Sequence, residues 1–454
     1  MQTLWQQGTT LEVEIEDLSH SGDGVARHDN RVIFISDSVT GDRVRVRLTH
    51  IQPSFTRAKL QEIVDPSEHR RRPRCIVADK CGGCQWQHIE DSYQQAAKKN
   101  QLIQTLQRVG GFEPGSYAIT EVLTGDSFAY RNKATYPLSR NQQGQVKAGY
   151  FRRGSHQIVN LNQCPIQDHR LNPLLADIKK DIEAQGWSIY NEKEHRGRLR
   201  HLGLRIGRRT GEMLLTLIST VPKLPGLPEQ AELWLERYPD LVGVLLNHNP
   251  KRGNVIFGDA AYLIAGRDFL TEIFADLTFR LRPETFFQVN TDVAEALLKS
   301  VAAELPDCQD KTLLDAYCGI GTFSLPLAHR FKQVIGVEVQ QQSVTQALVN
   351  TEINQIDNAT FITSKLADWC RGQPVLPEVI LLDPPRKGCD RETLECIASH
   401  PLEMLIYISC QPATLARDLK YLCEQTSLQL MNVKPADFFP QTPHLECAAI
   451  LKRF

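Results

Sequence analysis

The sequence has no long hydrophobic run and almost no net charge. None of its apolar stretches approaches the ~20 residues that a membrane-spanning helix requires. The first residues, Met1-Gln-Thr-Leu-Trp-Gln-Gln, lack the charged and apolar parts of a secretory leader. We therefore expect a cytoplasmic protein without membrane contact. The net charge of −1 neither indicates nor excludes a nucleic-acid partner, because local charge clusters matter more than the total.

Cysteine, in contrast, is abundant. The chain of 454 residues is long for one core, so we expect two or three domains. Its hydrophobic content of 41% and charged content of 23% are ordinary for a globular protein. Twelve cysteines in such a cytoplasmic chain indicate reduced thiols, metal ligation or catalysis rather than a disulfide framework.

Residues 11–65 alternate apolar and polar side chains in short bursts separated by turn residues such as Gly22-Asp-Gly24 and Thr40-Gly41. This pattern predicts a small antiparallel β-barrel that ends near Asp65-Pro66. Nine Arg and Lys residues lie between Arg43 and Arg74, against three acids. That excess suits a surface that follows RNA phosphates, with an ordinary solvated face as the alternative.

A cysteine cluster follows the predicted barrel. Cys75, Cys81 and Cys84 have C-x5-C-x2-C spacing, and Cys164-Pro165 lies far downstream. Four thiolates suit either zinc or an iron–sulfur cluster. Because a Cys followed by Pro resembles the end of ferredoxin-type runs, we favour a [4Fe–4S] cluster held by these four cysteines. The radical-enzyme spacing C-x3-C-x2-C is absent, which indicates a structural cluster.

The central region, 67–279, is predicted to contain a helix from Tyr93 to Val109 and, after Ile119, mostly strands. Two helical patterns interrupt the strands, Leu171 to Ala184 and Pro228 to Tyr238. The stretches Tyr130-Arg-Asn-Lys133 and 149–153 mix aromatic and cationic side chains, which suits base stacking beside phosphates. Residues 191–209 carry seven Lys or Arg against two Glu. Together these patches favour an RNA-binding surface.

The last third, 280–454, has the pattern of a Rossmann-like α/β domain. Thr312 to Phe323 reads as strand, Gly-rich turn and helix, with Gly319 and Gly321 in the turn. A second strand ends at Glu338, 23 residues after Asp315, where an acid typically binds ribose hydroxyls. The third glycine of a dinucleotide-binding turn is missing. A cofactor with ribose but no pyrophosphate, S-adenosylmethionine, therefore fits better.

Cys410 lies where a predicted strand gives way to a helix, because Pro412 cannot continue a central strand and 413–422 has helix-forming composition. Reacting groups gather at such strand ends in open α/β sheets. A thiol near a helix N-terminus can favour its thiolate form and act as a nucleophile. The alternative is an inert buried thiol.

Taken together, these features resemble the bacterial RNA uracil-C5 methyltransferases, within them the iron–sulfur type with an RNA-binding TRAM barrel that makes 5-methyluridine in 23S ribosomal RNA. The motifs that carry the resemblance are Phe287-Gln-Val-Asn290, Asp315 to Phe323, Asp383-Pro-Pro-Arg386, Ser409-Cys-Gln-Pro412 and His444-Leu-Glu446. The resemblance implies that Gln288, Tyr317, Glu338 and Asp383 contact S-adenosylmethionine. It also implies that Cys410 is the nucleophile and Glu446 the base, with no obligate protein partner.

The resemblance predicts three domains: a TRAM-like barrel over 1–66, a central domain with the cluster over 67–279, and a catalytic domain over 280–454. The alternatives are methylation of transfer RNA and a non-catalytic iron–sulfur RNA-binding protein. An amino-group methyltransferase that uses the Asp-Pro-Pro loop needs no thiol, so Cys410 argues against it. A redox enzyme is disfavoured by the missing dinucleotide turn.

Overall fold

A computed structural model describes residues 5–453 and divides the chain into two compact units. Unit 1 comprises Met1–Gln104, Phe151–Gln157 and Phe439–Leu445, and unit 2 comprises Thr105–Tyr150, Ile158–Phe438 and Glu446–Phe454. Two short stretches from later in the chain thus complete the N-terminal unit. The predicted boundaries 1–66, 67–279 and 280–454 stay predictions.

Unit 1 begins with the predicted barrel of six strands. In sheet order they are β1 (Thr10–Glu14), β5 (Arg43–Ile51), β6 (Phe55–Asp65), β4 (Arg31–Ile35), β3 (Gly24–His28) and β2 (Asp17–Leu18). Alternate residues of β5, among them Val44, Val46 and Leu48, are buried in one apolar core, which explains the alternation in the sequence. The barrel ends at Asp65, as predicted.

Helix α1 (Asp91–Thr105) follows the barrel, and a π-helical turn, η1 (Leu106–Gly110), continues it to Gly111. Within unit 1, Gln441 from the late stretch lies beside the start of α1. Its backbone N–H donates to Gln94 Oε1 (3.0 Å), and its side-chain amide donates to Asp91 Oδ1 (3.0 Å). Arg71 donates to the Gln441 side-chain oxygen (2.9 Å). These bonds anchor 439–445, the residues immediately before Glu446, inside unit 1.

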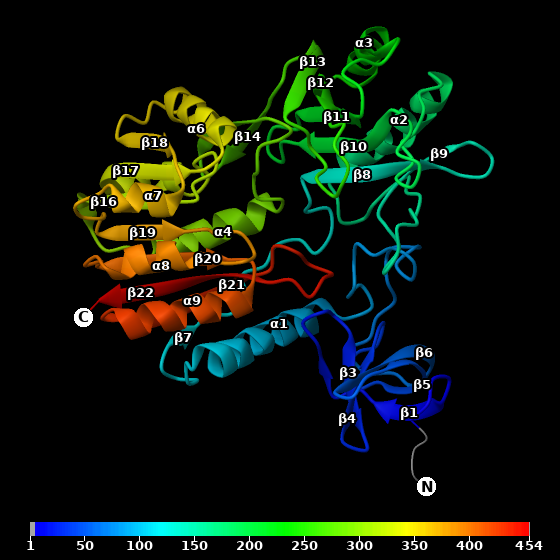
Figure 1. Cartoon of the computed structure of the whole chain (residues 1–454), viewed down its shortest axis with the longest axis horizontal. Helices are drawn as coiled ribbons and strands as arrows, with labels where there is room; N and C mark the ends of the chain where they lie inside the picture. The colour runs from blue at the N-terminus through cyan, green and yellow to red at the C-terminus, as the bar shows by residue number, and fades with distance from the viewer. Residues whose placement is uncertain (1–4, 454) are drawn as a thin grey trace. The chain divides into compact units, whose positions relative to one another are not determined.

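The described part of unit 2 contains two large sheets and a two-stranded hairpin (Figure 1). The first has six strands in the order β13 (Ala260–Gly266), β12 (Leu241–His248), β11 (Met213–Ser219), β10 (Leu199–Ile206), β8 (Lys133–Arg140) and β9 (Val146–Ala148). Helices α2 (Asn172–Ala184) and α3 (Leu227–Arg237) accompany it, close to the predicted ranges, and a short 3-10 turn, η2 (His169–Leu171), precedes α2. A hairpin of β14 (Leu270–Phe274) and β15 (Leu277–Leu281) leads on to the second sheet.

The second sheet has eight strands in the order β18 (Ala359–Thr363), β17 (Phe331–Glu338), β16 (Cys308–Ala316), β19 (Val379–Leu382), β20 (Met404–Ser409), β22 (Glu446–Arg453), β21 (Leu428–Ala436) and β7 (Ala118–Ile119). Its first five strands are parallel, and β22 enters antiparallel beside β20. The accompanying helices are α4 (Thr291–Ala302), α5 (Ser324–Leu327), α6 (Gln341–Ile353), α7 (Leu366–Arg371), α8 (Arg391–Ala398) and α9 (Pro412–Gln425), with a 3-10 turn, η3 (Ala328–Arg330), after α5.

This second sheet is the predicted Rossmann-like layer. Every residue of β19 and β20 is buried, because helices cover both faces of parallel strands in such folds. The chain runs outward from β16 to β17 and β18 and then returns to β19 on the other side of β16. The order therefore reverses between β16 and β19, where ligands bind in open α/β sheets. In the part of the chain that the structure describes, no helix is both long and apolar enough to span a bilayer.

Candidate active site

A pocket lies at the carboxyl ends of β16 and β19, at the point where the strand order reverses. Its lining residues come from the segment before α4, the turn after β16 and the end of β19: Phe286, Gln288, Asp315, Tyr317, Cys318, Gly319, Ile320, Thr322, Phe323 and Asp383. Three of the four predicted cofactor contacts, Gln288, Tyr317 and Asp383, therefore line one pocket. Glu338 is not among the lining residues. That these residues contact a cofactor stays a prediction.

The turn after β16 has an unusual backbone. Tyr317 takes a positive φ of 68°, which L-residues rarely adopt, and Gly321 has a φ of 80°. A Cβ on Gly321 would come within 2.8 Å of Leu325 Cγ, so this position requires glycine. The Gly319 N–H donates to Glu338 Oε2 (3.3 Å), and the Gln340 N–H donates to Oε1 (2.8 Å). Glu338 thus braces the turn from the end of β17.

Two buried carboxyl groups face this pocket. Burial, together with the nearby carboxyls of Asp383 and Glu338, raises the pKa of Asp315 to about 7, while hydrogen bonding by Ser324 opposes the shift. Burial alone raises the pKa of Asp383 to about 7. Asp315 Oδ2 is buried and has no hydrogen-bond partner among the described residues. An unsatisfied acceptor of this kind suits a ligand that is cationic or that donates hydrogen bonds.

Cys410 lies between the end of β20 and the start of α9, as predicted, and is partly buried. Burial raises the pKa of its thiol, and the nearby carboxyls of Glu446 and Asp383 raise it further, whereas Arg386 lowers it. The expectation that the helix N-terminus favours the thiolate is therefore not met in the free protein. Desolvation and the two acids outweigh Arg386 and the backbone hydrogen bond, the causes that lower this pKa.

Glu446 is the first residue of β22, which pairs with β20 so that Ser409 lies opposite Cys447. Cys410 follows Ser409 directly, and Glu446 directly precedes Cys447. Cys410 and Glu446 therefore lie beside each other at the ends of two adjacent strands. Glu446 is only 6% exposed. Burial raises its pKa to about 8, with Asp383 adding to the effect and Arg386 opposing it. Cys410, Glu446, Asp383 and Arg386 thus influence one another electrostatically.

Helix α9 fixes the loop that carries Arg386. Thr414 Oγ1 donates to the Arg386 carbonyl (3.2 Å), and Arg417 donates to the Lys387 carbonyl (3.0 Å). Asp418 is fully buried and accepts from the Cys389 N–H (2.9 Å) and from the Tyr407 hydroxyl (2.6 Å). The helix that follows the candidate nucleophile therefore also holds the Asp-Pro-Pro-Arg loop beside it.

Sequence reasoning missed three features of this site. Arg386 was quoted only as part of a motif, although it is the cation that acts on both Cys410 and Glu446. Asp315 was used for its spacing and not as a pocket residue. The third feature is the anchoring role of Asp418. In the sequence, only its place as a lone acid on an apolar helix face could have indicated this role, because Cys389 and Tyr407, its hydrogen-bond partners, lie elsewhere in the chain.

The predicted cysteine cluster is not assembled as a metal site. Among the described residues, no group of three or more His, Cys, Asp or Glu is placed to hold a metal ion. Cys75, Cys81 and Cys84 are partly buried and belong to unit 1, whereas Cys164 is buried and belongs to unit 2. Burial raises the pKa of Cys81, and the nearby Cys75 thiol raises it further. The described residues therefore give no complete ligand set for the [4Fe–4S] cluster.

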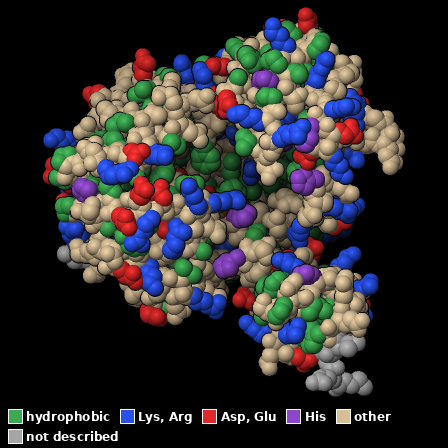
Figure 2. Space-filling view, in the orientation of Figure 1, with side chains coloured by type: hydrophobic (Ala, Val, Ile, Leu, Met, Phe, Trp, Pro, Cys, Tyr) green, Lys and Arg blue, Asp and Glu red, His purple; other side chains and the backbone are tan. Residues whose placement is uncertain are grey.

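The predicted cationic surface of the barrel is partly neutralised. Arg45 pairs with Glu62, and Arg57 pairs with Asp23 at 3.2 Å. In unit 2, a hollow lies between the parts formed by its two sheets, with apolar side chains on its floor and Lys and Arg side chains at its rim (Figure 2). Such a rim suits a polyanion with unpaired bases.

Two family models match the chain. Residues 260–369 and 374–454 match the model for tRNA (Uracil-5-)-methyltransferase, and residues 4–60 match the TRAM domain. The first match covers most of the second sheet, including Asp383, Cys410 and Glu446. The second covers most of the barrel of unit 1.

Curated relatives match nearly end to end. An uncharacterized RNA methyltransferase of Nostoc sp. (strain PCC 7120) is 54% identical over 99% of this chain and 97% of its own length. One from Bacillus cereus (strain ATCC 10987) is 34% identical over 98% of this chain and 96% of its own. Among solved structures, the Pyrococcus abyssi tRNA (uracil-54, C5)-methyltransferase in complex with S-adenosyl-L-homocysteine matches with a TM-score of 0.78. Its identity is 25%, over 97% of this chain and all of that one.

Proposed function

This chain belongs to the S-adenosylmethionine-dependent RNA (uracil-5-)-methyltransferases, and from that membership we propose that it methylates C5 of a uridine through a covalent Cys410–C6 bond. The observation that carries the mechanism is the pairing of Cys410 with Glu446 at adjacent strand ends, beside Asp383 of the cofactor pocket. A thiol and a buried base are the two groups that this reaction requires.

The bound cofactor supplies an electrophilic methyl group on a sulfonium. C5 of uracil is a weak nucleophile until the Cys410 sulfur adds to C6, which moves the electron pair of the C5–C6 bond onto C5. The sulfonium would give up its methyl carbon to C5, the S–CH3 electron pair staying on the sulfur of the departing S-adenosylhomocysteine, and Glu446 removes the C5 proton. The electron pair of that C–H bond restores the C5–C6 double bond, and the C6–S bond breaks to regenerate Cys410.

The electrostatics of the site fit these roles. A carboxylate whose pKa is near 8 is a stronger base than an exposed glutamate, so Glu446 is matched to a carbon-bound proton. The raised pKa of Cys410 means that its thiol holds its proton in the free protein, so a base must take that proton before the sulfur adds to C6, and Arg386 is the neighbouring group that favours the thiolate. Asp383 lines the pocket and acts on both residues, and this supports the proposal that it accepts a hydrogen bond from uracil N3–H and so disfavours cytosine.

The two catalytic residues should fail in different ways. Cys410→Ala should abolish methyl transfer and any covalent adduct. Glu446→Gln should still form the Cys410–C6 bond and transfer the methyl group. Because it cannot readily remove the C5 proton, the methylated RNA should stay attached to the protein and appear as a denaturation-resistant protein–RNA band. RNA that contains 5-fluorouridine should trap the wild-type enzyme in the same way, because fluorine cannot leave as a cation. Methylation of uridine by folded Cys410→Ala would refute the covalent route.

The substrate that we propose is 23S ribosomal RNA, on the analogy of the TRAM-bearing ribosomal enzymes. Transfer RNA is the second candidate, because the similar Pyrococcus abyssi structure is a tRNA (uracil-54, C5)-methyltransferase. A base in a duplex cannot expose C5 and C6 together, so either target must be flipped out or unpaired. Mass mapping of 5-methyluridine in both RNAs from a deletion strain distinguishes them: the modification disappears from only one.

We also propose, from the cysteine spacing, that Cys75, Cys81, Cys84 and Cys164 hold a structural [4Fe–4S] cluster. Within unit 1, the nearness of Cys75 to Cys81 supports part of this set, and the Gly83 N–H points to Cys81 Sγ at 3.4 Å. Protein purified without oxygen should contain about four irons per chain. One zinc without iron would refute the cluster and keep the ligands.

A further inference from the structure

The segment 282–290, here called the cofactor segment, joins β15 to α4 and forms no regular helix or strand apart from a bridge at Asn290. It nevertheless contributes Phe286 and Gln288 to the lining of the pocket. An irregular segment lacks ladder partners for its carbonyl groups, so other donors must satisfy them. The identity of these donors shows what holds the pocket wall in place.

The donors come from the six-stranded sheet. Lys133 Nζ donates to the Pro283 carbonyl (2.7 Å), and Arg205 Nη1 donates to the carbonyls of Arg282 and Thr285 (2.9 Å for Thr285). Asn132 donates its side-chain amide to the Gln288 carbonyl (2.9 Å) and its backbone N–H to Val289 (3.0 Å). Lys133 on β8, Arg205 on β10 and Asn132, the residue just before β8, thus hold the segment through the carbonyls of residues 282 to 289.

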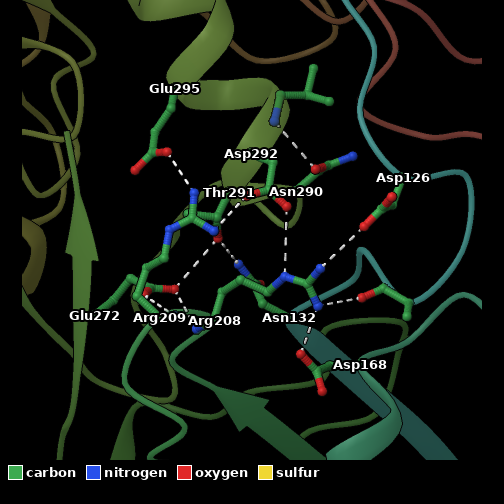
Figure 3. Close-up of polar contacts among 12 residues, drawn as sticks. Asp126, Asn132, Asp168, Arg208, Arg209, Glu272, Asn290, Thr291, Asp292 and Glu295 are labelled. Carbon is green, nitrogen blue, oxygen red and sulfur yellow. Dashed lines mark hydrogen bonds and ion pairs between the residues drawn. The ribbon is translucent and has the colours of Figure 1, made fainter.

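The junction continues into the helix that follows the segment (Figure 3). The Asn132 amide also donates to Thr291 Oγ1 (3.1 Å), the first residue of α4. Arg209, in the turn after β10, pairs with Asp292 at 2.6 Å and with Glu295 at 2.7 Å. The end of the cofactor segment is therefore fixed by the same sheet as its middle.

Arg205 is a costly residue to place here. It is 2% exposed, and its Nε and Nη2 have no hydrogen-bond partner among the described residues. Burial lowers its pKa to about 10, and burial together with Arg205 lowers the pKa of Lys133 to about 7, with Glu284 opposing both shifts. Apolar side chains of similar volume often stabilise a protein more than buried charges do. A role in positioning the cofactor segment explains why a guanidinium, that of Arg205, stands at this buried position.

We propose that Arg205 is a positioning residue for the cofactor, and that with Lys133 and Asn132 it holds the cofactor segment so that Phe286 and Gln288 form the pocket wall. This rests on the proposed function, because it takes the pocket to be the S-adenosylmethionine site. Arg205 itself is not among the residues that line the pocket. It acts through the backbone of Arg282 and Thr285.

The chain offers a matched control on the same strand. Arg200 also lies on β10, is buried, and donates to three carbonyls, those of Asn249, Lys251 and Gly253, in a different loop. Arg200→Lys and Arg205→Lys each keep the charge and lose the two-armed donor. A purely structural effect should be common to both variants. A positioning effect should appear only in Arg205→Lys.

Binding of S-adenosylmethionine to the full-length protein is measured by calorimetry, together with the rise in melting temperature that S-adenosylhomocysteine causes. Arg205→Lys should weaken the cofactor Kd about tenfold and lose most of that rise, because hydrogen bonds from charged donors are strong. In turnover assays, its KM for the cofactor should rise while kcat at saturating cofactor stays within about threefold of wild type. Arg200→Lys should match wild type in the cofactor Kd and in the rise of the melting temperature, the two measurements that need no RNA.

Equal cofactor binding by Arg205→Lys and wild type would overturn the proposal, as would equal weakening in both arginine variants. If Arg205→Lys does not fold, Lys133→Met decides: it keeps the side-chain stem and removes the donor to Pro283, and unchanged binding overturns the proposal. Failure of the proposed function is distinguishable. Wild-type protein that binds no S-adenosylmethionine would remove the cofactor site itself, before any variant is compared.

Discussion

At the scale of single residues, the site is defined by carboxyl groups that resist ionisation. Asp315 and Asp383 have pKa values of about 7 and Glu446 of about 8, each raised first by burial. At a pH between the ordinary carboxyl pKa and these raised values, the folded protein holds protons on these three groups that the unfolded chain has lost. These buried carboxyl groups thus reduce the stability of the protein as the pH rises.

This linkage gives a prediction for Glu446. Its folded pKa is raised, so the stability it contributes is present below the unfolded glutamate pKa and is lost as the pH rises to about 8. The melting temperature of the wild type should fall between pH 6 and pH 8.5 by more than that of Glu446→Gln. Differential scanning fluorimetry checks this, with Glu236→Gln on α3 as the exposed control. Equal falls in all three proteins would show that Glu446 ionises freely.

The residues of the site were predictable from sequence to different degrees. Cys410 could be placed because Pro412 marks the change from strand to helix two residues later. The partnership of Asn132 with the Gln288 carbonyl could not, because 156 positions separate the two residues and only the fold brings them together. The positive φ of Tyr317 was equally hidden, since a tyrosine gives no local signal for that conformation.

At the scale of elements, α9 connects Cys410, the candidate nucleophile, to the neighbouring loop. Its first turn follows Cys410, and its buried face presents Asp418 to the loop after β19. Gly388 in that loop has a φ of 76°, and a Cβ there would come within 2.5 Å of Asp418 Oδ2. The loop and the helix are therefore closely packed, so a substitution in one should shift the position of the other.

Loss of the Asp418 carboxylate should therefore lower the free energy of unfolding strongly. Asp418→Ala leaves the Cys389 N–H and the Tyr407 hydroxyl buried without their acceptor, which should cost about 2–4 kcal/mol of unfolding free energy. Thr414→Val removes the exposed hydroxyl that contacts the Arg386 and Gln411 carbonyls and should cost about 1 kcal/mol or less. Urea unfolding followed by fluorescence compares the two. Similar small losses would contradict the anchoring role.

At the scale of the whole molecule, strand patterns identified the barrel and the Rossmann-like sheet, but charge counts misjudged the barrel surface. The count of cations over Arg43 to Arg74 left out the acids that other strands supply. One of these is Glu12, whose carboxylate oxygens lie 3.7 Å from side-chain nitrogens of both Arg43 and Arg45. Sequence distance conceals such pairs, because β1 lies beside β5 only after folding. The predicted phosphate-binding surface therefore reduces to fewer residues than the sequence indicated.

Two cations of the barrel remain candidates for the expected phosphate binding. Arg47 and Lys59 are exposed and lie directly opposite each other on β5 and β6, an arrangement that is unfavourable without an anion. We expect an RNA phosphate there. Arg47→Gln with Lys59→Gln should weaken binding of a uridine-containing stem-loop RNA and lower the salt slope, the steepness with which log affinity falls with log salt concentration, by about 1–2. Filter binding over a range of salt concentrations measures both.

The control for this prediction removes a neighbouring ion pair instead. Arg45→Gln with Glu62→Gln deletes two charges from the same strands and leaves the net charge of the protein unchanged. Because this arginine is already neutralised by its partner, the salt slope should stay at the wild-type value. An equal loss in both double variants would mean that the barrel acts through its general shape. An unchanged slope in the Arg47 and Lys59 variant would assign phosphate binding entirely to other surfaces, and the hollow of unit 2 would then be the first to test.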